Sequence, residues 1–461
     1  MASAPGASFD VDAFLDSRRI GSLHIRVVII LALIMLVDGY DIFVVGSVLP
    51  AIADDWGIKP NLLAGVFIAQ QAGLLTGVTV TGPFADRNGR KTTLLACLAC
   101  FGLSTFFVSF VRTPFELIAL RFVSAIFFSG ALPNCVAMVS EIAPKRMRAG
   151  LISVVFCGYT GASFILAWVL AFVLEPFGWR GAFLLGGAMP LILLPIVWFF
   201  LPESIRFRAG RNPADPRIGG LLQQIDPSLR FRGDERFILE TRPRKEKSRP
   251  VIGLFQDGLL RITLLVWVAY LLAFLVNQLM SSWDTTIFHH VAKLSYKHIA
   301  LLGACRTTAG VIGTATAGFV MDRFGATRSL TFFFLLASVL IGGIAFSDLG
   351  ETSGLILFTL TGYAMNSALG GLNAIAAITY PPQMRVTGVA WGSGIGRIGG
   401  MLGPVAGALL LSGTPSTTTI YLFTAVPEAL AGIAIAMMIW VQRSALAKAA
   451  AAPAAAVEAI S

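Results

Sequence analysis

The stretch Gly82-Pro-Phe-Ala-Asp-Arg-Asn-Gly89 is a short polar break between two apolar runs. A similar stretch, Gly318-Phe-Val-Met-Asp-Arg-Phe-Gly325, follows 236 residues later. A second pair of similar stretches, Pro144-Lys-Arg-Met-Arg148 and Pro381-Pro-Gln-Met-Arg385, is separated by 237 residues. Two separate matches at nearly one offset indicate an internal repeat, in which two halves of similar structure follow each other along the chain.

The chain around these stretches is too apolar for a water-soluble protein. Hydrophobic residues make up 56% of the 461 residues and charged residues 13%, with a mean hydropathy of +0.78, whereas soluble domains carry about 25% charged residues. Twelve apolar runs reach the length of about 20 residues that a helix needs to cross the hydrocarbon core. They lie near 27–49, 61–82, 92–111, 115–139, 150–174, 179–201, 259–283, 299–320, 329–346, 354–379, 386–411 and 417–440.

These runs predict an all-α membrane protein with twelve transmembrane helices in two six-helix pseudosymmetric halves. We expect an N-terminal segment 1–26, a six-helix bundle 27–201, a central linker 202–258, a second bundle 259–441 and an Ala-rich tail 442–461. The first run is too long for the apolar part of a signal peptide, about 7–15 residues. It is therefore expected to stay as the first helix.

The basic residues predict the orientation. Short segments on the side of the N-terminus carry fourteen Lys and Arg residues, and those on the opposite side carry five. Loops rich in Lys and Arg stay on the cytoplasmic side of a membrane. We therefore expect the protein to lie in the inner membrane with both termini in the cytoplasm. The basic central segment also fits nucleic-acid binding, but a solvated linker resting against anionic lipid headgroups is the simpler interpretation.

Charged residues within the apolar runs are the candidate functional positions, because each costs about 2.5–3.5 kcal/mol to insert. Asp38 and Asp41 lie three residues apart on one helical face near mid-membrane. Desolvation favours the neutral form of a carboxyl there, which predicts proton binding; permanent structural ion pairs are the alternative. Arg121 should lie about 10 Å deep and Asp41 about 13 Å deep. Asp41 and Arg121 are therefore expected at similar depths in the membrane.

Other side chains in the runs suit an organic anion. Arg397 and Arg306 offer planar forks of donors that can bind a carboxylate with two bonds. For Arg397, permanent pairing with an acid is the alternative, and Glu428 is expected to be protonated or structural. Four aromatic residues are candidates for stacking on a ring, although packing is the commoner role of such residues: Tyr40, Phe43, Tyr363 and Trp391.

The repeated loops predict a gate. By pseudosymmetry, Asp86 should reach the positive end of the helix that starts near Arg385, and Asp322 that of the helix near Arg148. Such contacts would hold one side of the molecule shut; a plain solvated loop is the alternative. The candidate gate residues are Asp86, Arg87, Gly89, Arg90, Glu141, Arg148, Asp322, Arg323 and Arg385, with Gly89 and Gly325 providing the turns.

Several motifs carry a resemblance to a known family. The loop Gly82 to Lys91 resembles the signature loop of the major facilitator superfamily, and further motifs resemble its aromatic acid:proton symporter family. These are Asp38-Gly-Tyr-Asp41, Pro133-Asn134, Ser140-Glu-Ile-Ala-Pro-Lys-Arg-Met-Arg148, Tyr380-Pro-Pro-Gln-Met-Arg-Val-Thr-Gly388, Gly394-Ile-Gly-Arg-Ile-Gly399 and Gly403-Pro404. The similarity runs through nearly the whole chain.

The resemblance implies uptake of benzoate-like acids, such as protocatechuate or hydroxybenzoates, together with protons. In the superfamily's layout the first and fourth helices line a central cavity, so the resemblance implies an Asp41–Arg121 pair that opens when Asp41 is protonated. The parallel repeat places a substrate site between the halves at mid-membrane. One departure is the stretch Asn277-Gln-Leu-Met-Ser-Ser-Trp-Asp284, which lacks the Trp-Leu-Pro pattern typical of family members. This departure concerns the particular substrate more than the mechanism.

Alternatives remain open at this point. The substrate could be a non-aromatic acid such as muconate or a sugar acid, or the protein could be a proton-coupled efflux antiporter, although residues 155–161 lack the Pro typical of drug antiporters. A membrane sensor is a third class. No nucleophile–base or metal-ligand set indicates an enzyme, and Cys97 and Cys100 lack the partners of a zinc site. We expect no cofactor, no metal, no nucleic acid, and function as a monomer.

Overall fold

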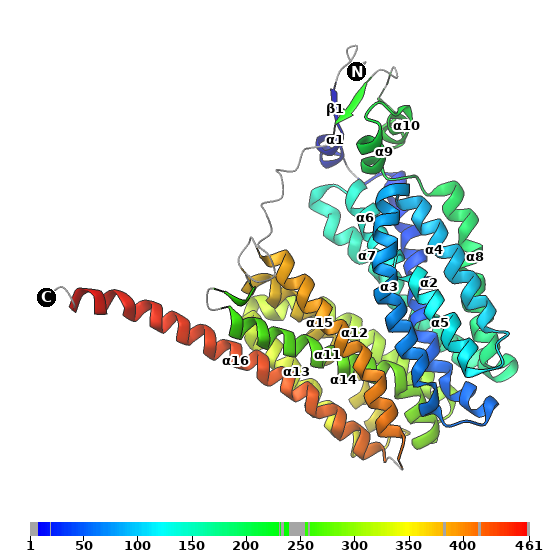
Figure 1. Ribbon diagram of the computed structural model, residues 1–461, viewed down its shortest axis with the longest axis vertical. Coiled ribbons are helices and arrows are strands. Elements are labelled where there is room, and N and C mark those ends of the chain that lie inside the picture. Colours follow the sequence, from blue (N-terminus) through cyan, green and yellow to red (C-terminus); the bar gives the residue numbers. More distant parts are fainter. Residues whose placement is uncertain are drawn as a thin grey trace. The chain divides into compact units, whose positions relative to one another are not determined.

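The computed structural model describes residues 8–18, 20–229, 231, 235–238, 254–256, 259–380, 384–413 and 416–458. The chain divides into two compact units, Met1–Trp56 with Gly65–Arg244, and Gly57–Ala64 with Lys245–Ser461. Each unit is a helix bundle (Figure 1) with its own cluster of buried apolar side chains. The division between Arg244 and Lys245 lies within the central segment that the sequence predicted as a linker, while residues 57–64 belong to the second unit.

The first unit contains most of the chain's short elements. In chain order its elements are β1 (Ser8–Asp10), α1 (Val11–Ser17), α2 (Ser22–Trp56), α3 (Ala64–Asn88), α4 (Arg90–Val108), α5 (Pro114–Phe128), α6 (Ala131–Ile142), the 3-10 helix η2 (Lys145–Met147), α7 (Arg148–Phe172), α8 (Leu174–Phe200), α9 (Ile205–Arg211), α10 (Pro216–Ile225) and β2 (Arg236–Ile238). Helices α5 and α6 together form one apolar span, Pro114–Ile142.

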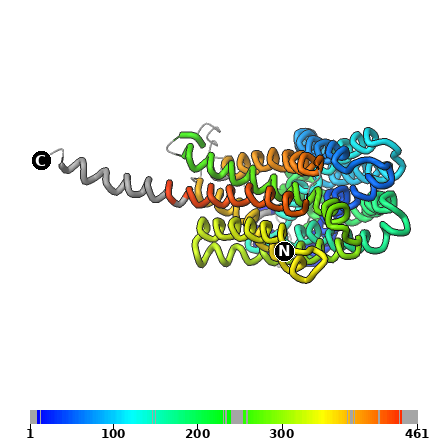
Figure 2. The backbone as a smooth tube through the Cα atoms, turned by 90° about the horizontal axis from the view of Figure 1, so that it is seen from below, coloured from blue at the N-terminus to red at the C-terminus, as the bar shows by residue number. Residues whose placement is uncertain are grey.

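The second unit is built of long helices and begins with a turn from the first half of the sequence. Its elements are the 3-10 helix η1 (Pro60–Leu63), α11 (Leu260–Thr286), the π-helical turn η4 (Ile287–Val291), α12 (Tyr296–Phe324), α13 (Ala326–Ile344), α14 (Thr352–Thr379), α15 (Arg385–Leu411) and α16 (Thr417–Glu458). Figures 1 and 2 both show α11 beside α15 and α16.

The described part of the chain has twelve helical spans that are long and apolar enough to cross a membrane. The predicted count of twelve is therefore confirmed, and every predicted run overlaps one span. The boundaries differ most in the seventh span, Leu260–Val291, which continues past residue 283, where the apolar run appeared to end. This extension places Asp284 inside a span.

Equivalent helices pack closely in the two units, as an internal repeat requires. In the first unit, Gly158 of α7 lies against the backbone of Ala32 in α2; in the second, Gly399 of α15 lies against the backbone of Leu271 in α11. A Cβ atom at either glycine would overlap the neighbouring helix, so only glycine allows this approach. Helix α15 begins 237 residues after α7, the offset of the repeated motif.

The N-terminal segment and the central segment form a small subdomain of the first unit. Strand β1 pairs in parallel with β2, with Phe9 opposite Phe237. Beneath them lies a core of buried side chains from α1, α9, α10 and β2: Val11, Phe14, Leu15, Ile205, Ala209, Ile218, Leu222 and Phe237. Arg18 forms an ion pair with Asp226 at 2.8 Å on its surface. We call these residues, 8–18 and 205–238, the terminal subdomain.

The expected solvated linker is wrong for residues 205–225. This segment forms α9 and α10, whose apolar faces are buried against α1. The segment folds because the apolar faces of two short amphipathic helices pack against α1, which is distant in sequence. No local pattern in the sequence indicates this packing. Residues 239–253 of the predicted linker lie outside the described residues.

Replacing Phe237 by Ala should open the terminal subdomain. Phe237 is 3% exposed, and removing a buried Phe ring costs about 3–5 kcal/mol, which is large for so small a core. We expect faster tryptic cleavage after residues of α9, measured by limited proteolysis of the membrane-embedded protein. The neighbour Ile238 is 47% exposed, so Ile238→Ala is the matched control. Equal cleavage rates in both variants would contradict this account of the core.

Candidate functional site

Asp41 of α2 and Arg121 of α5 form a buried ion pair in the first unit. Arg121 Nη1 donates to Asp41 Oδ1 at 2.8 Å, and Nη2 donates to Oδ2 at 2.9 Å and to the Asp41 carbonyl at 3.0 Å. Thr105 Oγ1 of α4 donates to Oδ1 at 2.7 Å. The Asp41 and Arg121 side chains are 1% and 0% exposed. The expected Asp41–Arg121 pair is therefore present, and with Thr105 it joins three helices.

The chemistry available to this pair follows from its burial. Removing one charge from a buried pair leaves the other uncompensated, at a cost of about 3–5 kcal/mol. A proton on Asp41 removes that charge, whereas the guanidinium of Arg121 cannot lose its own. The arrangement can therefore convert proton binding into a change of helix contacts. Its role in proton coupling stays a prediction.

Asp38 and Glu428 are buried carboxyls that form no ion pair like that of Asp41 among the described residues. Each is 1% exposed. Neither oxygen of Asp38, nor Glu428 Oε2, has a hydrogen-bond partner among the described residues. An isolated carboxylate is costly to bury, so each group needs either a partner that arrives or a proton. Asp38 lies one turn of α2 before Asp41, as the sequence indicated, and Glu428 lies in α16.

A second buried ion pair, which the sequence did not predict, lies in the second unit. Arg306 Nη1 of α12 donates to Asp284 Oδ2 of α11 at 2.6 Å, and the side chains are 15% and 10% exposed. Tyr421 Oη of α16 donates to Asp284 Oδ1 at 3.3 Å. Arg306 was a sequence candidate, but Asp284 was not. The signal for it was an acidic residue directly after an apolar run.

The other side of the Arg306 guanidinium faces soft and aromatic groups. Its centre lies 5.1 Å from the ring centroid of Phe358. Nη2 lies 4.0 Å from the sulfur of Met280 and 3.9 Å from that of Met365. Thioethers are weak acceptors, so this nitrogen retains donor capacity. Arg306 is therefore held by one carboxylate on one side and has an apolar, polarisable surface on the other.

The remaining candidates for substrate contact differ in their exposure. Arg397 of α15 is exposed, and no ion pair joins it to another residue in the described part of the chain. Trp391 is 43% exposed and stacks on Trp267 of α11, with ring centroids 5.9 Å apart. Arg397 thus remains available to an anion, and Trp391 presents part of its ring beyond the helix pair.

Tyr40 does not fit the expected stacking role. Its side chain is 0% exposed, its hydroxyl donates to the Ala182 carbonyl at 2.8 Å, and its ring lies against Gly186 of α8. It is a packing residue between α2 and α8 here. Phe43 contacts the ring of Tyr159 at 5.5 Å, and Tyr363 shares a hydrogen bond with Thr316 at 3.0 Å; both are half-buried.

The loop between α3 and α4 carries several of the candidate gate residues. Arg90 Nη1 lies 3.2 Å from Asp86 Oδ1, and Arg90 Nε lies 3.9 Å from Glu141 Oε1. Glu141 and Arg90, two of the candidate gate residues, are therefore in contact, while Arg87 is exposed. Gly89 has a φ of 97°, a backbone conformation that favours glycine.

The loop between α12 and α13 is the equivalent in the second unit. Gly325 has a φ of 89°, so both predicted glycine turns are confirmed. Asp322 and Arg323 are exposed. Arg148 at the start of α7 is half-buried, and the side chain of Arg385 lies outside the described residues. The expected contacts of Asp86 with the helix near Arg385, and of Asp322 with that near Arg148, concern both units and stay predictions.

Glu203 is a loop residue that the sequence did not reveal. Its Oε1 accepts hydrogen bonds from the backbone N–H groups of Arg90 at 2.8 Å and Lys91 at 3.0 Å, at the N-terminus of α4. The next residue, Ser204, donates from its hydroxyl to Glu141. Because Glu203 lies 113 residues from Arg90, no local pattern could identify this cap. It ties the signature loop to the end of α8.

Glu203→Ala should destabilise the first unit. The variant loses two charge-assisted hydrogen bonds and a negative charge at a helix N-terminus, together worth about 2 kcal/mol. We expect a lower thermal midpoint of the purified protein, measured by intrinsic fluorescence. Asp86 is 72% exposed, so Asp86→Ala is the control and should change the midpoint little. A midpoint unaffected by Glu203→Ala would show that the cap is not needed for stability.

Comparison with known proteins supplies the family. The family model of the Major Facilitator Superfamily matches residues 31–359 and 263–461. A 4-hydroxybenzoate transporter, PcaK, of Acinetobacter baylyi is 34% identical over 93% of this chain and 94% of its own length. A gallate transporter of Pseudomonas putida is 31% identical over 93% of this chain and 95% of its own length.

Solved structures agree on the fold. A bacterial homologue of the human lysosomal transporter Spinster, in an inward-facing conformation, has a TM-score of 0.69 at 16% identity, covering 92% of this chain and 98% of its own. A D-xylose–proton symporter has a TM-score of 0.68 at 15% identity, covering 90% and 97%. These relatives are transporters and not enzymes. The chain belongs to the Major Facilitator Superfamily, and its curated relatives confirm the likeness to the aromatic acid:proton symporter family that its motifs indicated.

Proposed function

We propose that this chain imports a small aromatic carboxylate together with protons, by alternating access across the inner membrane. Relatives at 31–34% identity over most of the chain are transporters of 4-hydroxybenzoate and gallate, both of which are aromatic acids. The observation that carries the proton part of the proposal is the buried Asp41–Arg121 pair, since a single proton changes its charge balance.

The coupling step begins at Asp41. When Asp41 accepts a proton, its attraction to Arg121 weakens, and the guanidinium must find another negative partner or water. The helix contacts that change with this proton favour the same state as binding of the carboxylate, so proton and substrate move together. Asp38, without a hydrogen-bond partner among the described residues, is the second candidate for a proton.

The aromatic carboxylate needs a cation and an apolar surface. Arg306 offers both, because its guanidinium has donor capacity left beside the ring of Phe358. The exposed Arg397 is a second cation, and the half-exposed ring of Trp391 a second stacking surface. A charge-assisted hydrogen bond to a carboxylate supplies orientation, and the ring contact selects aromatic over aliphatic acids.

The number of protons decides which gradient drives uptake. A monoanion entering with one proton moves no net charge, so each unit of pH difference supports about tenfold accumulation. A second proton adds about 2.3 kcal/mol per 100 mV of membrane potential. Asp38 and Asp41 provide groups for either stoichiometry.

The proposal includes the arrangement in the membrane. Both termini and the terminal subdomain lie on the cytoplasmic side, where the basic residues concentrate. Asp86 and Asp322, one in each repeated loop, belong to the cytoplasmic gate. One chain carries out the whole cycle without a second copy.

The test is uptake into energised cells that express the full chain. Labelled 4-hydroxybenzoate, protocatechuate, benzoate, muconate and a sugar acid are compared, with and without an uncoupler. We expect accumulation of a hydroxybenzoate that the uncoupler abolishes. Accumulation of only the non-aromatic acids would overturn the substrate class, and uncoupler-insensitive uptake would overturn proton coupling. Everted vesicles test direction, because efflux antiport would load them when they are energised.

A further inference from the structure

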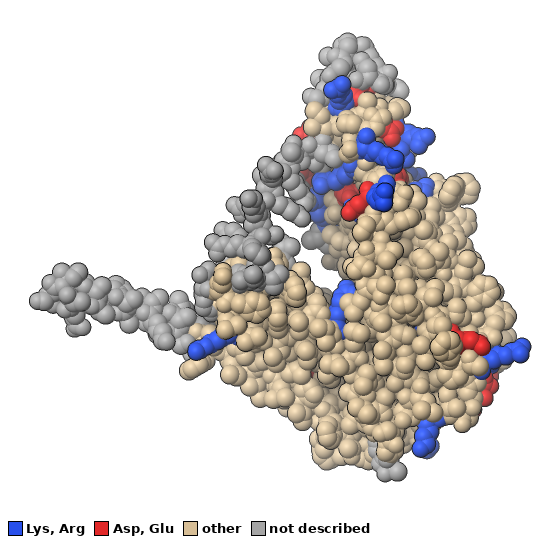
Figure 3. Space-filling view, in the orientation of Figure 1, with Lys and Arg blue, Asp and Glu red and all other residues tan. Residues whose placement is uncertain are grey.

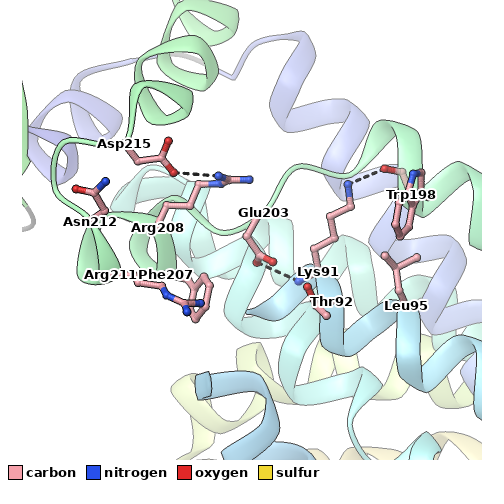
Figure 4. A pocket seen from close by; sticks show the side chains of 10 residues that line it. All are labelled: Lys91, Thr92, Leu95, Trp198, Glu203, Phe207, Arg208, Arg211, Asn212 and Asp215. Atoms are coloured by element: carbon pink, nitrogen blue, oxygen red, sulfur yellow. Dashed lines mark hydrogen bonds and ion pairs between the residues drawn. The ribbon is translucent and has the colours of Figure 1, made fainter. Parts of the chain in front are cut away.

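Two adjoining cavities lie where the terminal subdomain meets the helices of the first unit. The larger is about 520 Å³ and the smaller about 310 Å³, and both are lined by Lys91, Glu203 and Arg208. Figure 4 shows the larger one, with side chains from the start of α4, the end of α8, α9 and the turn before α10 around one space. Neither cavity has a part in the proposed transport cycle.

Basic groups outnumber acids around these cavities. Arg26, Lys91, Arg208, Arg211 and Arg217 line them, against Glu203 and Asp215. Figure 3 shows that most of the visible charged side chains gather on this part of the first unit, while few lie elsewhere on the same face. A concave surface with excess positive charge favours a ligand with more than one negative oxygen.

Both acids already have partners. Glu203 accepts from the backbone at the start of α4. Asp215 accepts from the Arg217 backbone N–H at 3.0 Å, caps α10 and pairs with Arg208 Nη1 at 3.0 Å. Both carboxylates are thus held in place, and five basic residues still face only two acids around the cavities.

Several donors remain unused. Lys91 Nζ donates to the Trp198 carbonyl at 2.6 Å, which leaves two of its three donors. Arg208 Nε is buried without a hydrogen-bond partner among the described residues. Arg211 and Arg217 are exposed at the rim. Lys91 and Arg208 line both cavities, Arg211 the larger and Arg217 the smaller. Several donors around one cavity suit the tetrahedral oxygens of a phosphate group.

The apolar side of the cavities points to a lipid as the source of that phosphate. Trp198, Phe199 and Phe200 end helix α8, line one or other cavity, and are 62%, 76% and 53% exposed. Aromatic residues of membrane proteins concentrate at the depth of the lipid headgroups. A headgroup phosphate can therefore reach the basic groups while its acyl chains contact these rings.

We infer that these cavities bind the phosphate of an anionic phospholipid headgroup, held by Lys91, Arg208 and Arg211. The bound headgroup would bridge α4 and α8 to α9, and so fasten the terminal subdomain to the membrane-spanning helices. Basic pockets beside transmembrane helices are typical sites for such headgroups. A free phosphate has the same oxygens, and the experiment separates the two sources.

The test uses the full chain purified in a neutral detergent. Short-chain phosphatidylglycerol, phosphatidylcholine and inorganic phosphate are titrated separately, and binding is followed by tryptophan fluorescence, to which Trp198 contributes. We expect saturable binding of phosphatidylglycerol. Binding should weaken about thirtyfold in Lys91→Gln/Arg211→Gln, a variant that keeps the Arg208–Asp215 pair and thus the fold of α9 and α10.

A matched control separates the site from general charge attraction. Arg261 and Arg328 are exposed basic residues of the second unit, so Arg261→Gln/Arg328→Gln removes the same charge elsewhere and should bind phosphatidylglycerol as the unmodified chain does. Inorganic phosphate binding with the same dependence on Lys91 and Arg211 would support the phosphate site but assign it to a soluble ligand. Equal weakening in both double variants, or none in either, would overturn the inference.

Discussion

Asp41→Asn is expected to abolish proton-driven accumulation of the substrate. The amide cannot bind a proton, so coupling is lost. It also leaves Arg121 as a buried cation without its counter-ion, which should lower the free energy of unfolding by about 3–5 kcal/mol. Accumulation in energised cells should fall to the level of cells without the protein. The amount of protein in the membrane is measured alongside, because part of the loss comes from poorer folding.

Arg121→Gln distinguishes coupling from folding. This variant leaves a carboxyl that a proton can neutralise, so it should fold better than Asp41→Asn and still fail to accumulate substrate. Thr105→Val removes one hydrogen bond to Asp41 and no charge, and it serves as the control that retains accumulation. Near-normal proton-driven accumulation in both Asp41→Asn and Arg121→Gln would refute the coupling switch.

Arg306→Gln should raise the apparent KM for the carboxylate by about thirtyfold, because a hydrogen bond to a charged group contributes about 1.5–3 kcal/mol. Initial uptake rates over a range of substrate concentrations measure it. Arg328→Gln removes a basic side chain that makes no described ion pair, and its KM should not change. An unchanged KM in Arg306→Gln would assign the carboxylate to another cation, with Arg397 the next to test.

The partner of Arg306 provides a second measurement. Asp284→Asn frees the guanidinium from its carboxylate, so the substrate no longer competes with Asp284 and KM should not rise. The double variant Asp284→Asn/Arg306→Gln removes both charges and should fold better than either single one. Additive losses of stability would show that the two side chains act independently despite their 2.6 Å contact.

The sequence predicted the features that depend on one helix at a time. Twelve spans follow from the length of apolar runs, and helical rise places Asp41 and Arg121 at similar depths. Their pairing needed, in addition, the helix layout that the resemblance to the superfamily implies. Asp284 was not predicted as a site residue because the apolar run appeared to end at residue 283. Helix boundaries depend on packing as well as hydropathy. Tyr40 was misjudged because its position shows a helix face but not which neighbour covers it.

Features that join distant segments could not be predicted. Glu203 caps α4 across 113 residues, and the terminal subdomain combines α1 with α9 and α10. Each of these helices has at most ten residues, too few to be stable alone. The apolar face of each helix indicates that it packs against something, but a single sequence does not identify the helix that covers it.

The pairing of β1 with β2 has a consequence for how the protein is made. All six spans of the first unit are synthesised between these two strands. The apolar side chains of α1 therefore have no native partner until residues 205–238 have been synthesised. The earliest part of the chain to be translated is thus among the last of the first half to reach its native contacts, and a chaperone or the membrane surface would have to shield it meanwhile.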